Sequence, residues 1–197
     1  MKRVVIMADG KGMRWNNYMG IPKHFAAVNG EKLISRSVRL LAKASKEFEI
    51  IVTSHDKRYE ISGSRRYEPL NNIYEIDRFT EELIVSDMCF LYGDTFYTES
   101  SIKKIIEEEA EDILFFGNQK TIVAVKIKDE MLFRTHVKQV KDLYLQGKLR
   151  KCAGWQVYQS FTGQSFENPI EIKEKFILVD DMTTDINSPC DYETIKI

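Results

Sequence analysis

The chain has 197 residues, of which 43% are hydrophobic and 30% are charged, and its net charge at pH 7 is −1. This composition is typical of a soluble globular protein, and the length suits a single domain spanning residues 1–197. The balanced charge argues against duplex nucleic acid as the main partner and leaves room for a local phosphate pocket. No apolar stretch approaches the roughly 18 residues of a membrane-spanning helix, so we expect no membrane partner.

The N-terminal apolar run is too short for a secretory signal. The three cysteines, Cys89, Cys152 and Cys190, lack the spacing of a metal site, and we expect them to be reduced thiols. These features predict a cytoplasmic protein. They leave the oligomeric state open, with a homodimer among the choices.

Apolar periodicity predicts alternating strands and helices. Strands are expected over residues 4–7 and 48–52, separated by a helix over 32–46, which favours a parallel sheet with a right-handed crossover. Residues 56–72 are polar and irregular, and a helix begins in 80–85 before a third strand at 88–92. The later elements are helices over 101–110 and 131–145, a hairpin of strands 113–116 and 121–127, a strand over 175–179, and a short helix from Asp191. The expected fold is Rossmann-like α/β, in three layers around a mostly parallel mixed sheet.

The first strand runs into a glycine-rich basic loop. Gly10 and Gly12 let backbone N–H groups approach phosphate oxygens, and Lys11, Arg14 and Lys23 can neutralise them. A tight strand-to-helix turn would account for the two glycines alone. The added cations favour phosphate binding.

Two common glycine-rich motifs are excluded by residue identity. Trp15 occupies the position where a dinucleotide fingerprint needs its third glycine, and the Gly-Lys-Ser/Thr end of a P-loop is absent. What is left is Gly-x-Gly-x-Arg after a strand, with Pro22-Lys23 further on.

This pattern resembles the N-terminal signature Ala-Gly-x-Gly-x-Arg followed by Pro-Lys of nucleotidyltransferases of the sugar-phosphate and MobA-like group. The resemblance implies a nucleotide-diphospho-sugar transferase fold, related to GT-A, with Arg14 and Lys23 as catalytic residues. Asp9 departs from the family's alanine, and a carboxylate there could repel phosphate or hydrogen-bond a ribose or base. The resemblance also implies a nucleotide site formed by Ala8, Asp9, Gly10, Lys11 and Gly12.

An apolar strand ends in Gly93-Asp94, which projects a carboxylate from the sheet edge where ligands of open α/β sheets bind. Such a carboxylate suits Mg²⁺. A turn or helix-capping role is the alternative. The resemblance implies that Asp94 is a metal ligand.

The segment 183–192 resembles the family's closing segment through Asp185-Ile186-Asn187, Pro189 and Asp191. The resemblance implies a second metal ligand there, with Asp185 as first choice and Asn187 or Asp181 in reserve. The alternative is a simple helix start, with proline at its first position and the acidic residues solvated.

Two further pairs are candidates. Arg78 and Thr80 precede the third strand, where the family carries a loop that contacts the base. Trp155 and Tyr158 have the helical spacing of core residues, which is the favoured interpretation, yet they fall where the family builds its acceptor pocket.

The resemblance implies a Mg²⁺-dependent enzyme that transfers NMP from an NTP, with CTP favoured, to a phosphorylated sugar, polyol or similar small phosphate monoester, releasing pyrophosphate. Such chemistry needs positioning and charge neutralisation more than a protein nucleophile. A molybdopterin guanylyltransferase lies within the same fold. A nucleotide-sugar-dependent glycosyltransferase is an alternative, although Asp94-Thr95-Phe96 lacks the second aspartate of its Asp-x-Asp motif. A non-catalytic nucleotide-binding module is another, and Asp9 favours it.

Overall fold

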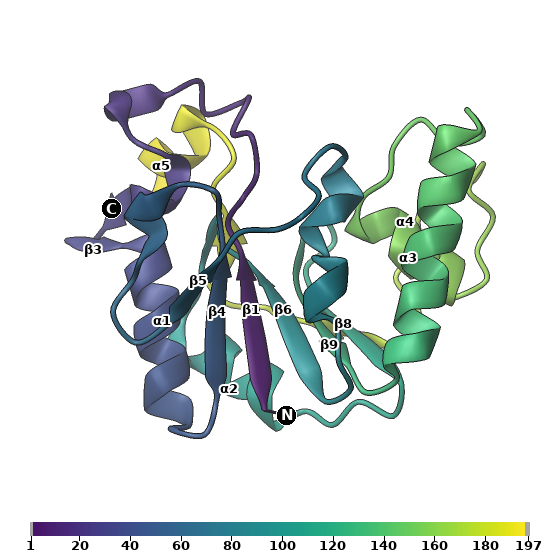
Figure 1. Cartoon of the computed structure of the whole chain (residues 1–197), viewed down its shortest axis with the longest axis horizontal. Coiled ribbons are helices and arrows are strands. Elements are labelled where there is room, and N and C mark those ends of the chain that lie inside the picture. The colour runs from purple at the N-terminus through teal and green to yellow at the C-terminus, as the bar shows by residue number, and fades with distance from the viewer. Residues whose placement is uncertain (1, 196–197) are drawn as a thin grey trace.

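The computed structural model describes residues 2–195, which are built around a seven-stranded sheet (Figure 1). The strands lie in the order β10-β8-β9-β6-β1-β4-β5. Strand β9 runs antiparallel to β6 and β8, whereas the other neighbouring pairs are parallel, so the predicted mixed and mostly parallel sheet is confirmed. The strand bounds are β1 (Arg3–Met7), β4 (Glu49–Thr53), β5 (Arg65–Tyr67), β6 (Met88–Tyr92), β8 (Ile113–Gly117), β9 (Ile122–Ile127) and β10 (Phe176–Leu178).

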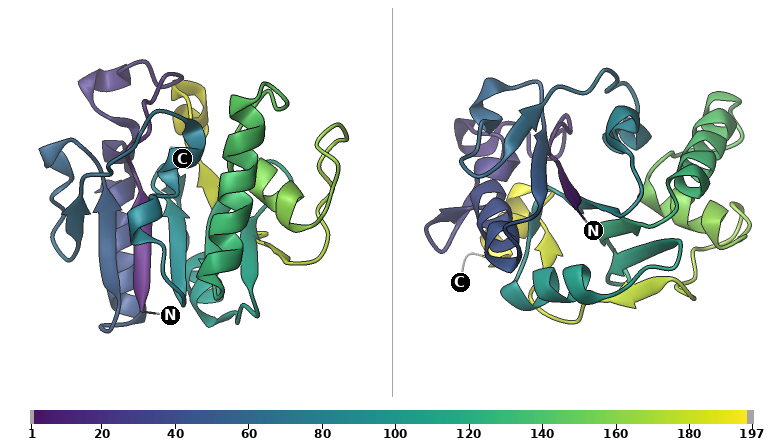
Figure 2. Two further views of the ribbon diagram at one scale, coloured as in Figure 1. Left: turned by 45° about the vertical axis from the view of Figure 1, so that its right-hand side comes forward. Right: turned by 60° about the horizontal axis from the view of Figure 1, so that its bottom comes forward.

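Helices cover both faces of the sheet, which gives the predicted three layers (Figure 2). Successive residues of a strand point to opposite faces. Val4 and Ile6 therefore pack in the core beneath α1 and α2, while Val5 and Met7 pack in the core beneath α3 and α4. The helix bounds are α1 (Leu33–Ala44), α2 (Glu99–Glu107), α3 (Glu130–Leu145) and α4 (Gly154–Phe161), and the 3₁₀ turns η4 (Glu75–Arg78) and η5 (Glu81–Leu83) lie on the α3 side.

A third, smaller core lies near the carboxyl-terminal edge of the sheet. Trp15 is buried there against Tyr192, its ring edge-on to the tyrosine, and its Nε1 donates a hydrogen bond to the carbonyl of Ile21 at 2.7 Å. This core holds the segment that follows β1. Its elements are the 3₁₀ turns η1 (Tyr18–Gly20) and η2 (Lys23–Phe25), the strand pairs β2 (Ala27–Val28) with β3 (Glu31–Lys32) and β7 (Thr95–Phe96) with β11 (Thr184–Asp185), and helix α5 (Pro189–Ile195).

Two expectations differ from the structure, and one strand pair was not predicted. Residues 56–72 contain a 3₁₀ turn, η3 (Lys57–Tyr59), and the short edge strand β5, whose polar sequence shows no strand periodicity. Residues 80–85 form only the single turn η5, because Ile84 is already extended. The pair β7 and β11 joins residues 90 positions apart and has no local sequence signal. None of the helices within residues 2–195 is long and apolar enough to cross a membrane.

The ends of β1 and β6 approach each other at Gly93. Its amide donates to the carbonyl of Met7 at 3.0 Å, and a Cβ at this position would lie 2.7 Å from the same oxygen and 3.2 Å from the His24 ring. Only glycine fits at this approach, and it fixes where Asp94 leaves the sheet.

We expect Gly93→Ala to lower the free energy of unfolding by about 2 kcal/mol, since the added methyl group must displace backbone. Urea unfolding checks this. The exposed turn variant Ser86→Ala should change stability by less than about 0.5 kcal/mol. Equal stability of Gly93→Ala and the wild type would contradict the tight contact.

Candidate active site

The glycine loop, residues 8–21, forms one wall of a cavity of about 320 Å³. The other wall comes from the exit of β4 and from η3, and Lys23 and His24 close it from the η2 side. Gly12 has φ 59°, a left-handed conformation that favours glycine. The structure therefore brings the predicted residues Ala8, Asp9, Gly10, Lys11, Gly12 and Lys23 together around one cavity.

Lys23 and Asp94 form a buried ion pair, with each residue only 6% exposed. Burial alone would raise the pKa of Asp94, but the Lys23 ammonium, helped by His24 and Arg78, holds that pKa below its ordinary value. The pair joins the end of the glycine loop to the exit of β6. It places a cation and a carboxylate, both desolvated, beside the cavity.

His24 lies next to this pair and is fully enclosed. Its Nδ1 is 2.7 Å from the hydroxyl of Tyr59, and the two rings meet edge-on. Burial and the neighbouring Lys23 charge lower the pKa of His24 to about 3, so the ring is neutral at physiological pH.

Asp185 is brought beside Asp94 by the pairing of β7 with β11. Thr95 is its register partner, and the amide of Ile186 donates to the carbonyl of Asp94 at 2.7 Å. Burial and the Asp94 charge raise the pKa of Asp185. Two carboxylates that repel each other in this way suit a shared cation.

Asn187 links this carboxylate to the glycine loop. Its side-chain amide donates to Asp185, and its Oδ1 accepts from Arg14 Nη2 at 2.7 Å. Asp181, one of the reserves for the metal, lies elsewhere: its carboxylate accepts from the Thr98 hydroxyl and from the amide of Thr183. It orders the segment before β11, so Asp181 is the weakest of the three metal candidates.

The donor set fits Mg²⁺ better than a transition metal. Within residues 2–195 no three His, Cys, Asp or Glu side chains gather as a metal-binding group. Mg²⁺ binds through one or two protein carboxylates and completes its shell with water and phosphate oxygens. Asp94, Asp185 and the Asn187 amide provide that kind of partial, oxygen-rich set.

Arg78 reaches the glycine loop from the opposite side. Its guanidinium packs against Gly10: a Cβ atom added to Gly10 would lie 3.2 Å from Nη2 of Arg78. Thr80, predicted with it, is buried and its hydroxyl bonds the carbonyl of Arg78 at 3.4 Å. It therefore shapes the turn, and its predicted contact with a nucleotide stays a prediction.

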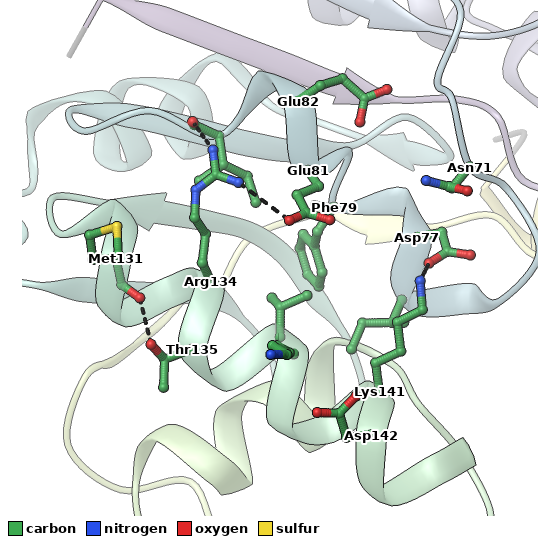
Figure 3. A pocket seen from close by; sticks show the side chains of 14 residues that line it. Asn71, Asp77, Phe79, Glu81, Glu82, Met131, Arg134, Thr135, Lys141 and Asp142 are labelled. Carbon is green, nitrogen blue, oxygen red and sulfur yellow. Dashed lines mark hydrogen bonds and ion pairs between the residues drawn. The ribbon is translucent and has the colours of Figure 1, made fainter.

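The turn η4, which carries Arg78, is bonded to α3 through Asp77 and Lys141 (Figure 3). Asp77 accepts from Lys141 of α3 at 2.6 Å and from the amides of Ile73 and Tyr74. A second cavity, of about 460 Å³, separates this turn from α3. The predicted residues that line a cavity are those around the smaller one, beside the glycine loop.

Asp9 makes contacts that its sequence position did not predict. Its carboxylate accepts hydrogen bonds from the backbone and ring of His55 and from the amide of Asn72. It is therefore not an unpaired negative charge facing phosphate. His55, Asn72 and Tyr59 are the site residues that sequence reasoning missed, because 46 or more positions separate Asp9 from each of its partners.

Tyr158 lies in the core beneath α4, fully buried, with its hydroxyl bonded to the backbone of Lys173 at 2.7 Å. This enclosure favours a core role, and the substrate-binding role of Tyr158 stays a prediction. Trp155 stacks on Phe176 at 5.6 Å between ring centroids and does not line the cavity of the glycine loop. Its role stays a prediction.

No family model matches the sequence, and no curated protein sequence matches it either. Solved structures do match. The inositol-1-phosphate CTP transferase from T. maritima is 15% identical, with a TM-score of 0.60 over 99% of this chain and 95% of its own. The chain has the nucleotide-diphospho-sugar transferase fold.

Two further structures agree. The 4-diphosphocytidyl-2C-methyl-D-erythritol synthase from Anaerococcus prevotii is 13% identical, with a TM-score of 0.61 over 98% of this chain and 93% of its own. UDP-glucose pyrophosphorylase from Acinetobacter baumanii is 10% identical, with a TM-score of 0.63 over 99% and 92%. The predicted fold is thus confirmed. At these identities the likeness concerns the fold, and an activity has to be argued from the residues of the site.

We expect Lys23→Met to lower the free energy of unfolding by about 3 kcal/mol, because it leaves Asp94 buried without its partner. The double variant Lys23→Met/Asp94→Asn should recover part of that loss. Urea unfolding of the three proteins at pH 7 measures both steps. A single variant as stable as the wild type would show that the pair is not desolvated.

We also expect His24 to make stability depend on pH. Its pKa in the folded protein is about 3, against 6.5 ordinarily, so between these values only the unfolded chain takes up the proton. The free energy of unfolding should fall with pH below about 6.5, by up to about 1.4 kcal/mol per unit. His24→Gln should show a flatter slope from pH 7 to 4.5 in urea unfolding, and an unchanged slope would contradict the neutral ring.

Proposed function

We propose that this protein is a Mg²⁺-dependent nucleotidyltransferase that transfers NMP from an NTP to a small phosphate monoester and releases pyrophosphate. The observation that carries the proposal is the buried Lys23–Asp94 pair beside the glycine loop, with Asp185 next to it. The structural neighbours support it, since one of them is an inositol-1-phosphate CTP transferase. For this chain we infer the acceptor class to be a phosphorylated sugar or polyol, with CTP as the first nucleotide to test.

In the proposed reaction, an acceptor phosphate oxygen attacks the α-phosphorus. The bond between the α-phosphorus and the bridging oxygen to the β-phosphate breaks, and pyrophosphate leaves with the electron pair. The acceptor is already largely deprotonated near pH 7, because its second pKa is about 6, so no general base is needed. The protein's task is to hold two anions together and to neutralise the developing charge.

Each residue has a role that follows from its position. Lys23 would hold the α-phosphate and the attacking phosphate, and its low exposure strengthens that interaction. Arg14, exposed in the middle of the loop, would neutralise the β- and γ-phosphates. Asp94 and Asp185 would hold Mg²⁺. When bound, this ion supplies charge neutralisation at the phosphate oxygens.

The two rival interpretations are less well supported. A glycosyltransferase needs a second carboxylate two positions after Asp94, and Phe96 lies there, paired with Thr184 between β7 and β11. A non-catalytic module was favoured by Asp9, whose charge is instead taken up by His55 and Asn72.

The test is to mix the protein with each NTP, Mg²⁺ and a panel of sugar and polyol phosphates, and to measure pyrophosphate release. Release should need both the acceptor and the divalent ion. Lys23→Gln, which keeps a donor for Asp94 and removes the charge, should lower kcat/KM by at least about 100-fold.

Lys46→Ala is the matched control, because Lys46 is an exposed cation beyond the far end of α1. It should keep wild-type kinetics. Pyrophosphate release by no pair of substrates would favour a binding module, whereas free nucleoside diphosphate from a nucleotide sugar would favour the glycosyltransferase. Wild-type turnover of Lys23→Gln would remove Lys23 from the mechanism.

A further inference from the structure

We infer that Asp9 is a positioning residue of the nucleotide site, which holds the start of the glycine loop and the ring of His55 in place before a nucleotide binds. The inference deepens the proposed function, since it takes the cavity beside the glycine loop to be where the nucleotide lies.

The Asp9 carboxylate joins three segments that are distant in sequence. Oδ1 accepts from the amide of His55 at 2.9 Å, and Oδ2 lies 2.7 Å from His55 Nδ1. The side-chain amide of Asn72 donates to both Oδ2 and the backbone carbonyl of Asp9, each at 2.7 Å. The exits of β1 and β4 and the connection from β5 to β6 thus meet at one side chain.

The two partners of this contact differ in burial: Asp9 lies inside the protein, whereas His55 lies at the surface. The Asp9 side chain is 12% exposed, whereas that of His55 is 54% exposed. A carboxylate withdrawn from water needs donors, and the three N–H groups provide them. The same bonds leave His55 on the surface of the cavity, which it lines together with Lys11 and Lys23.

The bond to Asp9 also fixes which nitrogen of the His55 ring is available to a ligand. When one ring nitrogen is held by a carboxylate, the orientation of the ring is fixed and the other nitrogen is left for a ligand. Nε2 is therefore the nitrogen that can contact a bound nucleotide. Asp9 acts on the nucleotide through this ring and through the loop, not by direct contact.

A fixed loop lowers the cost of binding. When only a fraction of the protein has its loop in the binding-competent state, the apparent affinity for the ligand is reduced to that fraction of its full value. We call the hydrogen bonds of Asp9 with His55 and Asn72 the Asp9 tie. Removing the tie should weaken nucleotide binding more than it slows the chemical step, because Lys23 is held by Asp94 and Asp185 by Asn187, independently of Asp9.

The experiment compares Asp9→Ala with wild type by isothermal titration with the Mg²⁺–NTP that the wild type prefers, and by steady-state kinetics. We expect Asp9→Ala to raise Kd and KM by about tenfold or more, the effect of losing hydrogen bonds to a charged group, with kcat changed less than about threefold. Asp9→Asn, which keeps one acceptor oxygen, should give an intermediate Kd. Adding His55→Ala to Asp9→Ala should weaken binding little further, since the two act as a unit.

Asp129→Ala is the matched control. Asp129 also accepts from a backbone amide, that of Leu132 at 2.9 Å, but it caps α3 away from the cavity. It should lose stability without changing Kd. If Asp9→Ala binds NTP within twofold of wild type, or lowers kcat as much as it raises KM, the positioning role is wrong.

Hydrogen exchange of the ligand-free protein separates this inference from the proposed function. The His55 amide should exchange at least about tenfold faster in Asp9→Ala than in wild type, whether or not any NTP binds. A wild type that binds no NTP overturns the proposed function and with it the nucleotide role of the tie. An unchanged His55 amide overturns the tie itself, and Asn72→Ala provides the same readout should Asp9→Ala fail to fold.

Discussion

The ion pair between Lys23 and Asp94 is the contact on which the geometry of the site depends. Two charges removed from water are costly, and their attraction offsets that cost only when they are held closely and surrounded by further polar contacts. Two separate segments bring the charges together. The turn η2 presents Lys23, and the glycine at the end of β6 lets Asp94 leave the sheet against β1. The neighbours follow from it: His24 stays neutral beside the cation, and Asp185 is destabilised as an anion beside the carboxylate.

The glycine loop is fixed at its start and its middle and is irregular after that. Asp9 ties its start to the exit of β4, and Trp15 ties its middle into the small core with α5. Between Trp15 and Lys23, Asn16, Asn17 and Met19 have left-handed backbone angles. Non-glycine residues in that region carry strain, and strain of this kind gathers at ligand-binding segments. The loop therefore combines a fixed first half with a second half that has little regular structure to hold it.

Much of the fold could be predicted because its strands are apolar and its helices periodic. The β1–α1–β4 unit, the β6 exit and the β8–β9 hairpin all carry local signals, and so do Gly10, Lys23 and Asp94. Contacts between distant segments could not be predicted this way. Asp185 reaches Asp94 through two-residue strands, and Asp9 finds His55 and Asn72 across connections without periodicity. Tyr158 shows a different ambiguity: an aromatic residue at helical spacing fits both a pocket and a core, and its burial in the structure favours the core.

Helix α5 has a consequence for how this protein can vary. Trp15 packs on Tyr192, the hydroxyl of Tyr18 donates to Glu193 at 3.0 Å, and Arg14 bonds Asn187 just before the helix. The glycine loop and the last described helix thus form one packed unit, although about 175 positions separate them along the chain. Among relatives of this chain, substitutions at positions 14, 15 and 18 should co-vary with those at 187, 192 and 193. Grafting the loop into another scaffold of the same fold would require α5 to be carried along with it.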